Sequence, residues 1–99
     1  MNSELDEYNK RQLHLMNSEI MRFDNGSIDL RRLITSLEGL LGALDNFDAN
    51  RKNALLRQWG VLEEVYAVTL DNRQTSVSRE NELLVKGAIS EITKLIGQL

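Results

Sequence analysis

Residues 28–70 read IDLRRLITSLEGLLGALDNFDANRKNALLRQWGVLEEVYAVTL, and this stretch decides the fold. In its first half, leucine and isoleucine recur at steps of three and four residues, the spacing that places side chains on one face of a helix. The second half repeats this spacing around Trp59 and Tyr66, the largest side chains available to lock two helical faces together. Asp45–Asp48 separate the two patterns. The stretch therefore predicts an antiparallel pair of amphipathic helices that forms the core.

Length and composition favour one helical domain. The chain has 99 residues, of which 41% are hydrophobic, too few for two independent cores. It contains no proline and only 5% aromatic residues, which argues against strands and turns and favours long helices. We therefore expect residues 1–99 to form a single all-α domain, a small four-helix bundle built on the antiparallel hairpin.

The helix boundaries follow from capping residues. A first helix is predicted at about Ser3–Phe23, because acidic residues follow the serine and Asp24–Gly26 tolerate the left-handed conformation that ends helices. The next helix is expected at Ile28–Leu44, with Ser27 as its cap. Gly39 and Gly42 lie off its apolar stripe and cost about 1 kcal/mol each against alanine, which predicts a close approach to the backbone there.

The second half of the chain is divided in the same way. Asp48 is the favoured cap of the third helix, with Asn46 as the rival, and this helix is expected to end at about Asp71. Asn72–Val77 is polar and lacks apolar periodicity, so we expect an exposed connection. Ser78 then restarts a helix that carries the last apolar stripe to the end of the chain.

Charge and cysteine content limit the cellular location and the binding partners that we expect. The absence of cysteine excludes disulfides, thiolate catalysis and sulfur-ligated zinc. The chain has no apolar run of about eighteen residues, and Met1–Lys10 is polar and acidic, so we expect a cytoplasmic protein that does not enter a membrane. The net charge of -3 disfavours direct binding to nucleic acid or to an anionic membrane surface, because both need a basic face.

Residues that could catalyse a reaction are scarce. His14 is the only histidine, so neither a two-histidine metal site nor a cysteine–histidine pair can be built. No serine lies in a Gly-x-Ser-x-Gly elbow, and the glycines match neither a phosphate loop nor a dinucleotide fingerprint. We therefore expect no catalytic residues, no metal and no cofactor, and we predict that the protein is not an enzyme.

Carboxylates remain the main candidates for function. Glu63 and Glu64 are adjacent on a helix and point about 100° apart, which weakens a catalytic pair. Arg31, Glu38 and Asp45 recur every seven residues along one flank of the leucine stripe. These residues could either form ion pairs between helices or bind a partner.

Three strings in the chain resemble a family of small bacterial immunity proteins. They are Ile28–Ile34, Leu37–Leu41 and Trp59–Val68, and the most specific part is the pattern Trp-x-x-Leu-Glu-Glu-Val-Tyr-Ala. The family accompanies polymorphic and contact-dependent growth inhibition toxins, and the similarity spans about Tyr8–Asp71. The resemblance implies an all-helical cytoplasmic protein that binds and silences the toxic C-terminal domain of its cognate effector. An RNase, and foremost an EndoU-like RNase, is the toxin we expect.

Such a role requires a contact surface on at least two helices. RNA-cleaving toxins tend to be basic around the substrate groove, so we predict that exposed carboxylates contact the toxin, whereas Trp59 belongs to the core rather than the interface. Active-site plugging and binding elsewhere both remain open. The predicted toxin-binding residues are Glu38, Asp45, Asp48, Glu63, Glu64 and Asp71.

Two other classes of function are compatible with these residues. The first is a helical regulatory or adaptor module that binds a helix of another protein without catalysis. The second is an enzyme that uses carboxylates and Mg²⁺, because bundles can place such ligands from different helices. An apolar edge left uncovered by the four helices could also pair with a second copy, so the oligomeric state stays open.

Overall fold

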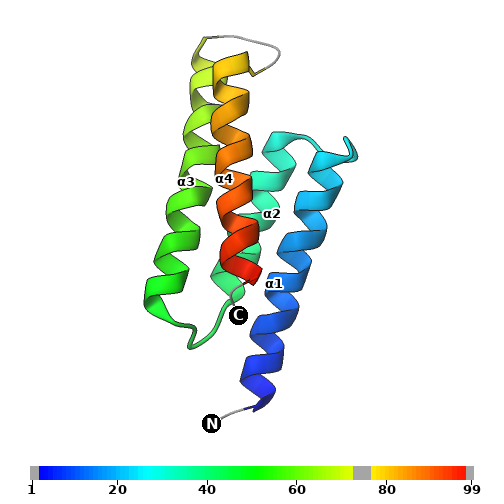
Figure 1. Ribbon diagram of the computed structural model, residues 1–99, viewed down its shortest axis with the longest axis vertical. Helices are drawn as coiled ribbons and strands as arrows, with labels where there is room; N and C mark the ends of the chain where they lie inside the picture. The colour runs from blue at the N-terminus through cyan, green and yellow to red at the C-terminus, as the bar shows by residue number, and fades with distance from the viewer. Residues whose placement is uncertain (1–2, 73–76, 98–99) are drawn as a thin grey trace.

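The computed structural model describes residues 3–72 and 77–97. Its four α-helices are α1 (Ser3–Asp24), α2 (Leu30–Ala43), α3 (Ala49–Asp71) and α4 (Arg79–Gly97). Consecutive helices run in opposite directions along the long axis of the molecule (Figure 1). The prediction of an all-α four-helix bundle is therefore confirmed.

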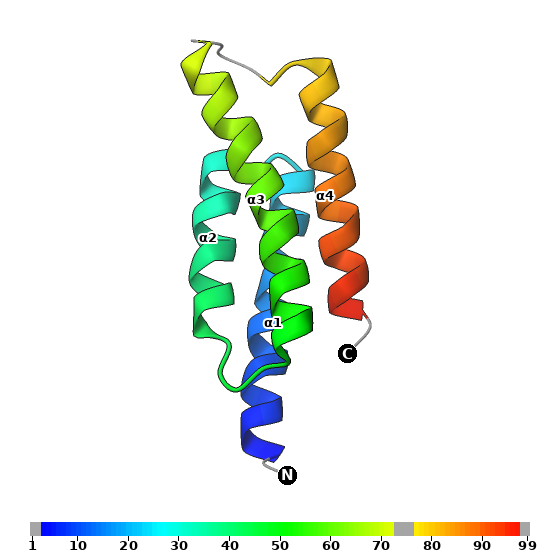
Figure 2. The ribbon, with the colours of Figure 1, turned by 90° about the vertical axis from the view of Figure 1, so that its left-hand side faces the viewer.

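The helices form a four-sided ring. α1 packs on α2, α2 on α3 and α3 on α4, whereas α4 closes on α1 through the smallest contact of the described residues. The α1–α2 and α3–α4 hairpins are offset along the long axis: α3 and α4 extend past the α1–α2 turn at one end, and α1 extends past the α2–α3 loop at the other (Figure 2). This offset makes the molecule elongated, with extents of 49 × 25 × 19 Å.

The core lies where the sequence pattern places it. Leu33 on α2 and Leu62 on α3 have 0% of their surface exposed, and burying a side chain of this kind stabilises the fold by about 1.5–3 kcal/mol. α1 and α4 add their own stripes to the same cluster. All four helices therefore share the core, and the predicted α2–α3 pair forms one side of the ring rather than its centre. The most deeply buried large side chains are Met16, Leu33, Leu37, Leu55 and Leu62.

Trp59 connects the two hairpins. Its ring is partly buried against the core, and its indole N–H donates to the backbone carbonyl of Ile34 at 3.0 Å. The bond joins α3 to α2, so it holds the second hairpin on the first. The prediction that Trp59 belongs to the core is confirmed, although part of its ring remains exposed.

The α1–α2 turn begins as predicted but delays the next helix. Gly26 adopts a left-handed φ of 83°, and the Ser27 N–H donates to the Arg22 carbonyl at 2.8 Å, which closes a Schellman motif. The prediction of Ser27 as the cap is wrong, because Ser27 is used to close this motif. Asp29 caps α2 instead, since its Oδ1 accepts from the Arg32 N–H at 2.9 Å. The helix therefore starts at Leu30 rather than Ile28.

The caps of the last two helices agree better with prediction. Asp48 is the N-cap residue of α3, but its carboxylate accepts no capping bond and lies 3.9 Å from Arg51 Nε. The rival cap Asn46 sits in the loop with a positive φ of 49°. Ser78 caps α4, because its Oγ accepts from the Asn81 N–H at 3.2 Å. In the predicted connection, Val77 is partly buried against the core, and residues 73–76 lie outside the described residues.

Gly39 and Gly42 do not mark a close contact. Both glycines are exposed, and a Cβ atom added at either would meet no atom within 4 Å. The expectation that another segment approaches the backbone there is wrong. Their presence in α2 therefore carries a cost in helix propensity that no packing in the described residues offsets.

Alanine at these positions should stabilise the protein. We expect Gly39→Ala and Gly42→Ala each to raise the free energy of unfolding by about 0.5–1 kcal/mol, because alanine loses less backbone entropy in a helix. Urea unfolding followed by circular dichroism measures this change. The matched control is Gly26→Ala, which should lower stability because residue 26 has a positive φ. A loss of stability in Gly39→Ala or Gly42→Ala would show that these sites are constrained.

Candidate functional site

The six carboxylates predicted to bind a toxin are all exposed, but they do not form one patch. They occupy four levels along the molecule. Glu38 lies on α2, Asp45 and Asp48 lie on the α2–α3 loop, Glu63 and Glu64 lie in the second half of α3, and Asp71 is its last residue.

Glu38 and Glu63 share the outer face formed by α2 and α3. The bond between Trp59 and Ile34 marks the sides on which these helices meet. Glu63 follows Trp59 by four residues and Glu38 follows Ile34 by four, so each carboxylate lies near the edge of its helix that adjoins the other. Because the helices are antiparallel, the two residues are displaced by about 12 Å along the axis. We call this surface the α2–α3 face.

The other predicted residues extend away from this pair. Asp48 and Asp71 lie at opposite ends of α3, which has 23 residues and so a length of about 34 Å. Glu64 points about 100° away from Glu63. The structure thus brings Glu38 and Glu63 onto one face. Asp45 lies beyond the end of this face that is nearest the α2–α3 loop, and Asp71 lies at the opposite end of α3. Glu64 points to the side of the face.

Most of these carboxylates form no ion pair within the described residues. The ion pairs there join Arg22 to Glu19 at 3.3 Å and Arg51 to Asp48 at 3.9 Å, each along a single helix or its cap. Interhelical pairing of Glu38 or Asp45, one of the two open interpretations, is therefore not observed in this part of the chain. Five of the six carboxylates are exposed on helices or a loop without a charged partner among the described residues.

A buried asparagine fixes the loop that carries Asp45 and Asp48. The Asn9 side chain is 6% exposed, its Nδ2 donates to the Asp45 carbonyl at 2.8 Å, and its Oδ1 accepts from the Asp45 N–H at 3.0 Å. The amide thus satisfies both backbone groups of Asp45 and ties α1 to the α2–α3 loop. Sequence reasoning missed this residue. The available signal was its position four residues before Leu13 and seven before Met16, a polar side chain on an apolar stripe.

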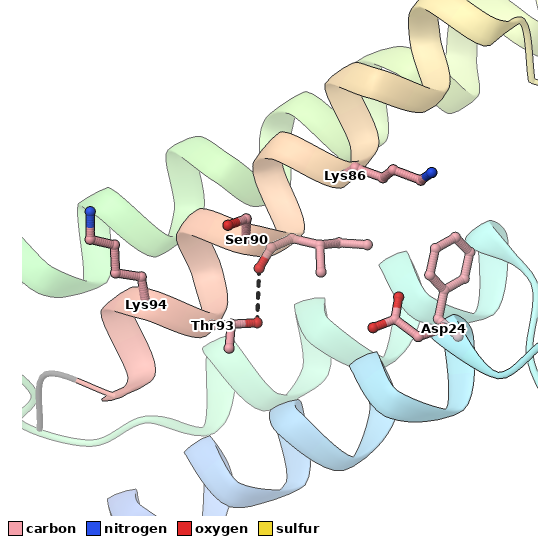
Figure 3. Close-up of a pocket in the computed structure, with 7 residues that line it drawn as sticks. Asp24, Lys86, Ser90, Thr93 and Lys94 are labelled. Carbon is pink, nitrogen blue, oxygen red and sulfur yellow. Dashed lines mark hydrogen bonds between the residues drawn. The ribbon is translucent and has the colours of Figure 1, made fainter.

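A groove opens on the opposite side of the ring, between α1 and α4. Its volume is about 780 Å³ (Figure 3). Phe23 and Ile89, which both contact the core, line its apolar part. Asp24 on α1 points toward α4, and Lys86 and Lys94 lie along the α4 edge. The sequence did not predict this groove, because it results from the offset of the two hairpins.

Comparison of the chain with known proteins identifies no relative. No protein-family model, no curated protein and no solved structure matches it significantly. The resemblance to immunity proteins therefore depends on the three strings alone and remains a prediction.

The described residues hold neither a candidate membrane span nor a candidate metal site. None of these helices is both long enough and apolar enough to cross a membrane. Residues 3–72 and 77–97 contain no group of three or more His, Asp or Glu side chains arranged to hold a metal ion.

Removal of the Asn9 amide should destabilise the protein. Asn9→Ala leaves the N–H and carbonyl of Asp45 without their partners, so we expect a loss of about 2 kcal/mol. For a domain of this size the melting temperature should fall by roughly 10 °C. Thermal unfolding measures the change, with Asn17→Ala as the control, because Asn17 lies on the same helix and its side chain makes no hydrogen bond among the described residues. Equal melting temperatures for the two variants would refute the role of Asn9.

Proposed function

We propose that this protein is an immunity protein that binds the toxic domain of a cognate effector and blocks it, without catalysis of its own. The proposal rests on the exposed carboxylates that have no ion-pair partner among the described residues. Two of these carboxylates, Glu38 and Glu63, share the α2–α3 face. These side chains stand on helices held by the core, so they are positioned before a partner arrives.

The most specific string of the family resemblance supports this assignment. In α3 three of its apolar members face inward, whereas Ala67 is exposed: Leu62 and Val65 are buried, and Trp59 packs toward α2. Its two glutamates, Glu63 and Glu64, are exposed. The same string thus combines residues that hold the hairpin together with charges available to another protein.

The size of the surface is adequate for tight binding. A cell must keep its own toxin at a very low free concentration, which requires nanomolar affinity or better, about -12 kcal/mol. A standard interface takes about 800 Å² from each partner. The protein exposes 6707 Å², so parts of two adjacent helices suffice.

Glu38 and Glu63 on the α2–α3 face suit an RNA-cleaving toxin, although the exposed Arg31, seven residues before Glu38 on the same flank of α2, offsets part of their charge. Such enzymes are expected to be basic where they bind RNA, and carboxylates opposite that basic surface raise the rate of association and set the orientation of the complex. Bound there, the bundle occludes the active site or the path of the RNA. An EndoU-like RNase is the toxin that the family resemblance favours.

Co-expression tests the assignment directly. We expect the protein to restore growth of cells that express the toxin domain encoded beside its gene, to co-purify with that domain, and to suppress its nuclease activity at equimolar concentration. The purified protein alone should cleave no RNA. Failure to rescue growth, together with failure to bind the toxin domain, would reject the proposal.

Charge reversal tests the binding face. Glu63→Lys combined with Glu64→Lys should slow association with the toxin domain about tenfold at low ionic strength and flatten its salt dependence, because electrostatic steering is lost. Stopped-flow fluorescence gives both quantities. Glu80→Lys combined with Glu91→Lys is the control, since it changes the net charge equally on α4. Identical rates for the two double variants would remove Glu63 and Glu64 from the interface.

A further inference from the structure

We propose that the groove between α1 and α4 is a second binding site, and that its occupant is an amphipathic helix of another protein that carries acidic residues beside its apolar stripe. The groove lies across the ring from the α2–α3 face, so the proposal concerns a surface separate from the one assigned to the toxin. The shape of the groove, its apolar lining and its charge support the proposal.

The groove has the dimensions of a short helix. A second hollow of about 420 Å³ shares Phe23 and Lys86 with the main groove of about 780 Å³, so the two are continuous along α4. Together they extend from Glu82 to Lys94, twelve residues of α4 or about 18 Å. This length accommodates about three turns of a docked helix. Because α4 and α1 make the smallest contact in the ring, a third helix can pack against both.

Two exposed apolar side chains lie near the groove without lining it. Met21 is 67% exposed and Leu83 is 65% exposed, the two highest values among the large hydrophobic residues described. Met21 precedes the groove residue Asp24 by three positions and Leu83 precedes Lys86 by three, so each lies about 60° further round its helix. The apolar surface of the main groove itself comes from Phe23 and Ile89.

The charge of the groove determines which side of the docked helix must carry acidic residues. The residues that line the main groove include two lysines and one aspartate, a net charge of +1, whereas the second hollow adds Asp29 and Glu82, so the positive charge is confined to the main groove. Lys86 and Lys94 are eight residues apart, about 12 Å along α4, and neither forms an ion pair within the described residues. Acidic side chains two turns apart on a docked helix would face both lysines.

The far end of the groove sets the register. The second hollow includes Asp29 and Glu82, which would repel acidic residues placed there. The acidic flank of the occupant must therefore lie opposite Lys86 and Lys94, and its neutral turn must lie near Leu30 and Val77.

A pair of designed peptides tests this proposal. The probe is a capped fourteen-residue helix with leucines spaced three and four apart and two glutamates eight residues apart on one flank; the matched peptide carries lysines at those two positions. In ¹⁵N NMR titrations of the full chain, we expect the glutamate peptide to bind about tenfold more tightly at low salt, with the difference shrinking at high salt. Shifted amides should lie in α4 and the second half of α1.

Variants of the groove complete the experiment. Ser90→Trp, at an exposed position that lines the groove, should weaken binding of the glutamate peptide at least tenfold. Glu91→Trp is the control, because residue 91 points about 100° further round α4 and does not line the groove. Lys86→Glu with Lys94→Glu should reverse the preference between the peptides. Equal affinity for both peptides, or a glutamate peptide that binds Ser90→Trp as well as the wild type, would overturn the proposal. Neither result would bear on toxin binding by the α2–α3 face.

Discussion

The packing of α2 against α3 holds the two hairpins of the bundle together. Leu33 and Leu62 are fully buried there, and the indole of Trp59 adds a hydrogen bond to the Ile34 carbonyl. Since α1 and α4 make the smallest contact of the ring, most of the contact between the two hairpins lies at this interface. Its apolar side chains fix the distance and the register between the helices, and these in turn determine which polar residues share a face.

The apolar periodicity predicts the helices and the core because both depend on local spacing. Leucines at steps of three and four lie on one side of α2 wherever that helix is placed. The helix ends are harder to predict, since Ser27 and Asp29 compete for one cap and the Schellman motif at Gly26 decides between them. Contacts between distant segments, such as Asn9 with Asp45, depend on the relative placement of whole helices, which local spacing does not define.

The candidate site shows the same division. The exposure of Glu38, Glu63 and the other carboxylates was predictable, because they interrupt apolar stripes at outward positions. Their grouping was not, since it requires the register of α2 against α3, and the length of α3 separates Asp48 from Asp71. The α1–α4 groove lay beyond prediction because it arises from the offset of the hairpins. The result is a scaffold with two unlike surfaces: the α2–α3 face, which carries Glu38 and Glu63, and the apolar α1–α4 groove, which Lys86 and Lys94 border.

We propose that the protein acts through contact at the α2–α3 face, and the structure of its complex with the proposed cognate toxin domain tests this. We expect Glu38 and Glu63 to lie within the interface opposite basic side chains of the toxin, while the core of the bundle remains unchanged. An interface formed by other faces, with Glu38 and Glu63 still in solvent, would refute the proposal.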